Sequence, residues 1–177
     1  MRMLVFARRN AKEILRDPVN LGFGLGFPLA LLLLLWAIDR NVPVSIMPIQ
    51  RLAPGISMFG LSFISLFSAT LISRDRGSSF LARLFSSPLT AGDFILGYAL
   101  PLLPMCVVQS LLCYLLALVL GLEAGWELLP AMAVLLPADI FFIGVGLLCG
   151  SVFSDKQVGG VCGALLTNLA ALLSGTW

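Results

Sequence analysis

The stretch from Leu52 to Ser73 reads LAPGISMFGLSFISLFSATLIS, and Arg74-Asp75-Arg76 follows it directly. These 22 residues carry no charge, and a helix needs ~20 mostly apolar residues to cross a hydrocarbon core ~30 Å thick. Backbone N–H and C=O groups find no water inside lipid, so a stretch of this kind crosses the membrane as a helix. The segment therefore predicts a membrane-spanning helix that ends at a charged triplet.

The same pattern recurs on both sides of this stretch. Runs such as Leu31 to Leu35 contradict the strict alternation of a membrane β-barrel. We predict an all-α integral membrane protein, a bundle of about five transmembrane helices forming a single domain over residues 1–177. The predicted spans lie near residues 19–38, 54–73, 98–121, 128–153 and 157–177.

Composition excludes several other classes of protein. Of the 177 residues, 11% are charged and 59% are hydrophobic, whereas an ordinary soluble domain is about 25% charged. The chain contains no His, which removes His-based catalysis and most zinc chemistry. The only lysines are Lys12 and Lys156, and neither follows a Gly, so the phosphate loop of ATPases is absent. We therefore expect no enzyme activity and no cofactor on this chain.

The charged residues predict the orientation of the chain in the membrane. Nine of the 11 basic residues lie in residues 2–16, in residues 74–83 or at Lys156, which are all on one side of the predicted spans. Only Arg40 and Arg51 lie on the other side. Basic residues accumulate on the cytoplasmic side, so we predict a cytoplasmic N-terminus.

Residues 2–17 form a basic segment that also contains apolar side chains. One interpretation is a short amphipathic helix lying on the inner membrane surface, ended by Asp17-Pro18. The other is a charged flank that only sets the topology. Periodicity alone leaves both open.

The second cytoplasmic segment, residues 74–89, predicts a short amphipathic helix. Gly77-Ser78 offers a helix start, and Pro88 ends the helix. Between them, four apolar residues share one face, with Arg83 away from it: Phe80, Leu81, Leu84 and Phe85. Such a helix either floats in the interface or docks into a groove on a cytoplasmic partner.

Asp139 is the one acidic residue expected near the middle of a span, where a charge costs at least ~2.5–3.5 kcal/mol. It is either a substrate, ion or proton contact inside the bundle or a neutral, hydrogen-bonded residue at a packing seam. Gln109 is a second polar residue at membrane depth, interpreted as a packing contact or as part of a translocation pathway. Small-residue pairs at Gly22/Gly26, Gly146/Gly150 and Gly159/Gly163 predict contacts between spans of the same chain or, for one of the pairs, the interface of a homodimer.

Three stretches together resemble the permease subunits of type-2 ABC transporters, which are chiefly bacterial exporters. The first runs from Ala7 to Pro18, with an Arg-Asp-Pro end. The second runs from Arg74 to Gly97 and contains Leu-Ala-Arg-Leu and Ser-Pro-Leu. The third is Leu-Leu-Ser-Gly at residues 172–175, after which the family has a re-entrant hairpin and a sixth span that we expect this chain to lack.

The resemblance implies a role for each cytoplasmic segment. Residues 2–17 look like the amphipathic connecting helix of the family, and residues 74–89 look like its coupling helix, which inserts into a separate ABC ATPase subunit. ATP then belongs to that partner. The residues implied in coupling are Arg76, Gly77, Phe80, Leu81, Leu84, Phe85 and Pro88.

The partners and location follow from the same resemblance. We expect a cytoplasmic ABC ATPase, a second permease of the same or another kind, the lipid bilayer and no nucleic acid. The location implied is a bacterial plasma membrane, crossed several times. Two alternatives stay open, namely a secondary transporter or ion pathway that uses Asp139 and a structural membrane subunit without a substrate of its own.

Overall fold

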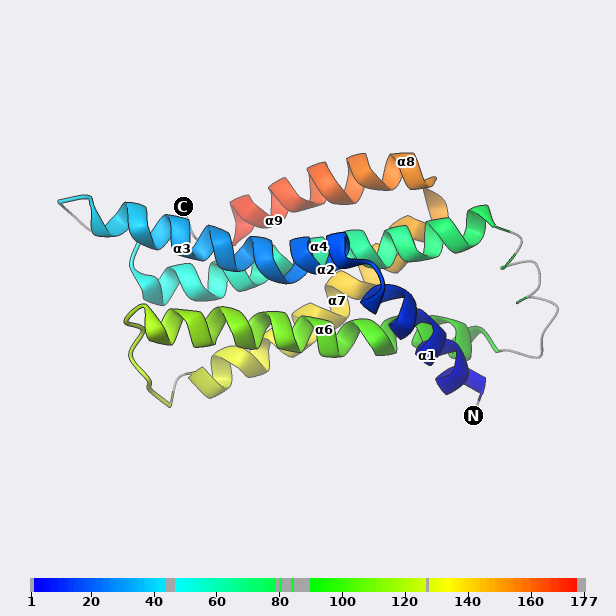
Figure 1. Ribbon diagram of the computed structural model, residues 1–177, viewed down its shortest axis with the longest axis horizontal. Helices are drawn as coiled ribbons and strands as arrows, with labels where there is room; N and C mark the ends of the chain where they lie inside the picture. Colours follow the sequence, from blue (N-terminus) through cyan, green and yellow to red (C-terminus); the bar gives the residue numbers. More distant parts are fainter. Residues whose placement is uncertain are drawn as a thin grey trace.

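The computed structural model describes residues 2–43, 47–78, 80, 84, 90–126 and 128–174. All regular elements in these ranges are helical, and five helical stretches are long and apolar enough to cross a membrane. They run side by side along the longest axis of the molecule (Figure 1). The predicted all-α membrane bundle is therefore confirmed. The five stretches are Pro18–Arg40, Ile49–Gly77, Ala91–Val119, Leu128–Val152 and Asp155–Leu173.

The first and fifth stretches are each divided by a wide, π-helical section. The first consists of α2 (Pro18–Leu21), the π-helical residues Gly22–Gly26 and α3 (Phe27–Arg40). The fifth consists of α8 (Asp155–Val158), the π-helical residues Gly159–Leu166 and α9 (Thr167–Leu173). The other three are the single helices α4 (Ile49–Gly77), α6 (Ala91–Val119) and α7 (Leu128–Val152).

Two spans begin or end well outside their predicted limits. Helix α4 continues from the apolar stretch through Arg74-Asp75-Arg76, because each of these side chains finds a partner at the end of the bundle. Helix α6 begins at Ala91 rather than near residue 98. A capping box fixes that start, since Asp93 N donates to Thr90 Oγ1 and Thr90 N donates to Asp93 Oδ2.

Helix α4 forms the centre of the bundle and packs most extensively against α7. Small residues permit this close approach. A Cβ added at Gly146 would collide with Ser65 and Ser68, and one added at Gly150 would collide with Ala69. The predicted packing role of Gly146/Gly150 is therefore confirmed.

The other small-residue pairs behave differently from the prediction. Within the described part of the chain, nothing lies within 4 Å of a Cβ added at Gly22, Gly26 or Gly159, while Gly163 makes only ordinary contact with Leu66. The prediction of a contact between spans of the same chain at Gly22/Gly26 was wrong, because the intervening Gly24 faces Phe67 and Met105 of the bundle instead.

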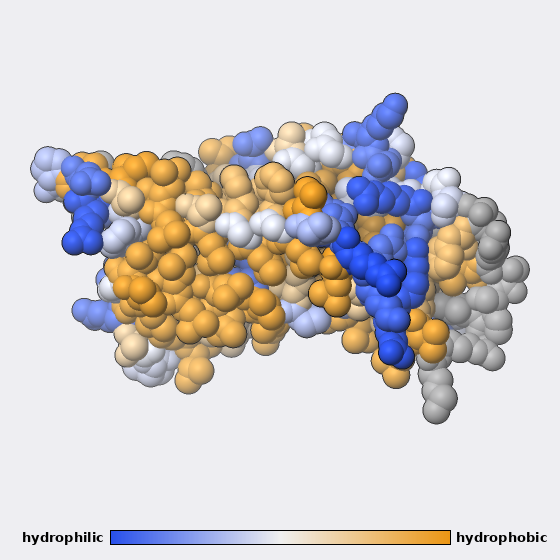
Figure 2. Space-filling view, in the orientation of Figure 1, coloured by the Kyte–Doolittle hydropathy of each residue, from blue (hydrophilic) through white to orange (hydrophobic). Residues whose placement is uncertain are grey.

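Helix α1 (Arg2–Leu15) lies across one end of the bundle rather than along it (Figure 1). An apolar belt covers the middle of the molecule, and hydrophilic residues gather at its two ends, with a band over α1 (Figure 2). Helix α1 leads directly into the first span at Pro18.

Candidate functional site

The end of α4 beside α1 carries a charged triplet, Arg74-Asp75-Arg76, whose members bind three different parts of the fold. Asp75 is the buried member, with 4% of its surface exposed. Its carboxylate accepts two hydrogen bonds from the Arg9 guanidinium, at 2.6 Å to Oδ2 and 2.8 Å to Oδ1. Tyr98 Oη donates a third at 2.7 Å. Asp75 thus joins α4 to α1 and to α6 at one point.

Two further contacts hold α1 on the bundle at this point. Asn10 is fully buried, and its Nδ2 donates to the Gly97 carbonyl oxygen at 3.0 Å. The Phe6 ring packs edge-on against Tyr98 with ring centres 4.9 Å apart. A Cβ at Gly97 would collide with that ring, so glycine is what allows α1 to approach α6. We call Arg9, Asn10, Asp75 and Tyr98 the Asp75 network.

The two arginines of the triplet bind the remaining spans. Arg76 donates to carbonyl oxygens at the end of α7, including Phe153 O at 2.9 Å and Ser151 O. These carbonyls lack helical partners, and a cation is favourable beside them. Arg74 lies 3.5 Å from Asp17 and 3.9 Å from Asp155, at the starts of the first and fifth spans. The triplet therefore contacts every other span at one end of the bundle.

The charges of α1 divide between the bundle and the solvent. Burial lowers the pKa of Arg9, but its hydrogen bonds to Asp75 and the charges of Asp75 and Glu13 raise it above the ordinary value, so Arg9 remains a cation. Burial raises the pKa of Glu13, and the Arg9 charge lowers it by less. The Arg9–Glu13 pair, 2.8 Å apart, is more than one third exposed on each side, so it contributes little to stability.

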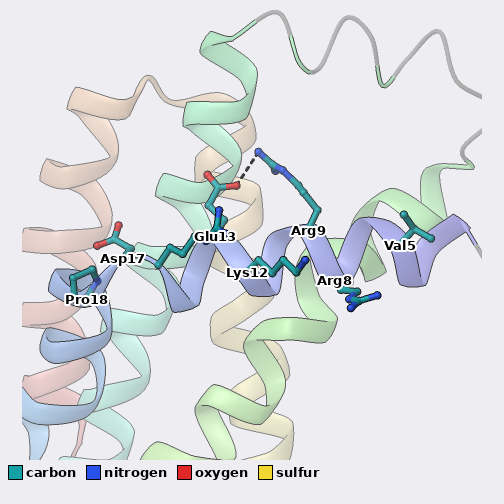
Figure 3. A pocket seen from close by; sticks show the side chains of 8 residues that line it. Val5, Arg8, Arg9, Lys12, Glu13, Asp17 and Pro18 are labelled. Carbon is teal, nitrogen blue, oxygen red and sulfur yellow. Dashed lines mark ion pairs between the residues drawn. The ribbon is translucent and has the colours of Figure 1, made fainter.

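An open cavity of about 790 Å³ runs along α1. Figure 3 shows Arg9 reaching toward Glu13 while Arg8 and Lys12 leave the helix on another side. Arg8, Lys12 and Arg16 are spaced four residues apart, so they form one basic stripe on the helix. With the exposed Val5 and Leu15, this is the composition of a helix that lies in the membrane interface.

The predicted coupling residues fall into three groups. Arg76 and Gly77 form the last residues of α4. Phe80 and Leu84 are half-buried and pack against the core cluster, the group of buried hydrophobic residues that includes Leu71 and Tyr98. The Phe80 ring also stacks on Phe6, and the Arg9 guanidinium lies 4.2 Å from the centre of the Phe80 ring. Phe80 N donates to Ser78 Oγ at 3.2 Å, as expected of a helix-capping serine. Leu81, Phe85 and Pro88 lie outside the described residues.

The two polar residues predicted at membrane depth are both buried between helices. Gln109 Nε2 donates to Ser57 O at 3.3 Å, and its side chain fills the space left by Gly60. The contact joins α6 to α4, while Gln109 Oε1 is buried without a hydrogen-bond partner among the described residues. Asp139 is 1% exposed, and its Oδ1 has no hydrogen-bond partner among the described residues.

Sequence reasoning missed the Asp75 network. Arg9 lay within a generally basic segment, and Asp75 stood between two arginines, so neither differed from an ordinary surface charge. The only available signal was an acid inside an otherwise basic segment between two predicted spans. Tyr98 and Asn10 gave no signal, because their role depends on the docking of α1 against α6.

A bundle of five long apolar helices with a further helix docked across one end defines an integral membrane protein. Comparison with protein families matches residues 1–177 to the membrane family described as "ABC-2 type transporter". The chain belongs to this family and is a permease component of an ABC transporter. Searches of the curated proteins and of the solved structures gave no match.

Proposed function

We propose that this chain is the permease subunit of an ATP-driven exporter, in which a separate cytoplasmic ATPase docks against residues 74–89. The observation that carries the proposal is the triplet Arg74-Asp75-Arg76, which joins the start of that segment to α1 and to every other span. Force applied to the segment reaches the whole bundle through these contacts. ATP is bound and hydrolysed on the partner, which supplies the energy for outward transport.

Within this proposal, the predicted coupling helix has two faces. Phe80 and Leu84 face the bundle, where they pack against Phe6 and the core cluster. They anchor the segment, while its remaining residues meet the ATPase. Residues 2–17 serve as the connecting helix, since α1 contacts both the anchored Phe80 and the buried Asp75. Two such permeases and two ATPases form the working exporter in a bacterial plasma membrane.

Docking of the ATPase is tested by placing a charge in the proposed coupling segment. Phe85→Asp is expected to abolish co-purification with the co-expressed cognate ATPase, because a carboxylate replaces an apolar group at the proposed interface. The matched control is Val42→Asp, the same kind of change in an exposed apolar residue at the opposite end of the bundle. Retention of the ATPase by Phe85→Asp would contradict the proposed docking site.

The orientation of the chain is tested with single cysteines on a background in which the four native cysteines are replaced by Ala. In intact cells, a cysteine at Asn41 is expected to react with a membrane-impermeant maleimide, whereas one at Lys12 is expected to react only after the cells are opened. The reason is that the basic residues of α1, together with Arg74 and Arg76, lie at the end of the bundle that carries α1, and basic residues accumulate on the cytoplasmic side. The reverse labelling pattern would place the N-terminus outside.

A further inference from the structure

Asp139 differs from the other buried acid, Asp75, because no side chain in the described part of the protein is seen to bind its Oδ1. It lies in the middle of α7, and nothing among the described residues binds its Oδ1. A buried carboxyl group is stable in a membrane only when it is neutral or when a donor or cation satisfies it. A partner supplied from outside the chain would therefore bind here favourably.

A cavity of about 210 Å³ lies beside Asp139, between α6 and α7. Its walls are apolar except for Asp139 and Ser110, and Ser110 Oγ is also buried without a partner among the described residues. Val107 and Leu136 line it too, and they are 39% and 51% exposed on the apolar surface of the bundle. The cavity therefore opens toward the hydrocarbon of the membrane.

A separate cavity, of about 300 Å³, lies near the loop between α6 and α7, and Gln50 and Pro54 of α4 also line it. Tyr114 lies one helical turn beyond Ser110 and lines this cavity, and its buried hydroxyl has no partner in the described part of the chain. Glu123 and the exposed Trp126 lie at the loop end. No Lys or Arg lines either cavity among the residues described.

We infer that the cavity beside Asp139 is a binding site for an amphiphilic organic cation, with Asp139 as its counter-ion. The Asp139 carboxyl group disfavours anions, and an ammonium group supplies the hydrogen-bond donors and the charge that Asp139 lacks. The Ser110 hydroxyl oxygen accepts another of its N–H groups.

The size of the cavity beside Asp139 limits the guest to one head group. At about 30 Å³ per water in the liquid, 210 Å³ equals roughly seven waters. An ammonium group with a few methylenes fills it, and a longer apolar chain extends between Val107 and Leu136 into the lipid. The inference rests on the proposed function only in treating this cation as a substrate of the exporter.

The test is equilibrium binding of octylammonium and octanol to the purified full chain in a neutral detergent, by titration calorimetry. The chain is expected to bind octylammonium roughly tenfold or more tightly than octanol, as a charge-assisted hydrogen bond provides. Asp139→Asn is expected to remove this preference. Asp155→Asn, the same substitution at the first residue of α8, is expected to retain it.

A second variant leaves the carboxyl group in place. Ala133 lines the cavity and faces outward, so Ala133→Phe is expected to block the opening and weaken binding of octylammonium without altering Asp139. Equal binding of octylammonium and octanol, or unchanged binding in both Asp139→Asn and Ala133→Phe, would overturn the inference. The measurement needs neither ATP nor ATPase, so a negative result is distinct from a failure of ATPase co-purification.

Discussion

Replacing Arg9 by Gln is expected to lower the free energy of unfolding by about 3 kcal/mol, because it leaves the Asp75 carboxylate buried with Tyr98 as its remaining partner. Removal of one member of a buried pair costs about 3–5 kcal/mol, and the partial exposure of Arg9 places the effect at the lower end. Helix α1 should then leave the bundle. Denaturant titration followed by circular dichroism measures the first effect, and faster trypsin cleavage within residues 2–16 reports the second.

Removing the acid of the pair instead of the base should lower the free energy of unfolding by less. Asp75→Asn removes the buried charge itself and leaves Arg9, which is one third exposed, able to bind water. The expected loss is about 1 kcal/mol, and the double variant should lose less than the sum of the two single variants. An Arg9→Gln chain as stable as the parent, with unchanged trypsin resistance, would refute the role of the pair in docking α1.

Gly146→Ala is the second change with a large expected effect. The added methyl group would collide with Ser65 and Ser68 of α4, and the Ser65 contact is with backbone that cannot turn aside. Overpacking of this kind costs about 1–3 kcal/mol, and the central position of the α4–α7 contact places Gly146→Ala at the upper end. Gly150→Ala should behave in the same way, because it meets the backbone of Ala69.

Gly144→Ala supplies the matched control on the same helix. Nothing lies within 4 Å of a Cβ at Gly144 in the described part of the chain, and alanine stabilises a helix relative to glycine by about 0.5–1 kcal/mol. We expect Gly144→Ala to equal or exceed the parent in thermal stability in detergent, while Gly146→Ala unfolds at a lower temperature. Equal melting temperatures for the two variants would show that α4 and α7 are not closely packed at this point.

The sequence alone determined the class of fold, the number of spans and the family. These properties depend on the residues within each segment. About 20 consecutive apolar residues suffice to cross the bilayer, and the basic residues of each connecting segment indicate its side of the membrane. The sequence-based prediction placed the start of the third span too late, because a capping box begins α6 at Ala91. It also assigned the first span's contact to Gly22/Gly26, whereas Gly24 in the π-helical section faces inward.

Tertiary structure decided which charges are buried and what they bind. Arg9 and Asp75 are 66 residues apart in the chain, and only the docking of α1 on α4 and α6 brings them together and excludes water from the carboxylate. Asp139 is a second example. The energetic cost of placing a charge there follows from its position in an apolar run of the sequence. The cavity beside it, and the absence of a partner for its Oδ1 among the described residues, depend on how α6 and α7 pack. Hydrophobicity is a property of each residue, but desolvation and pairing are properties of its neighbours in space.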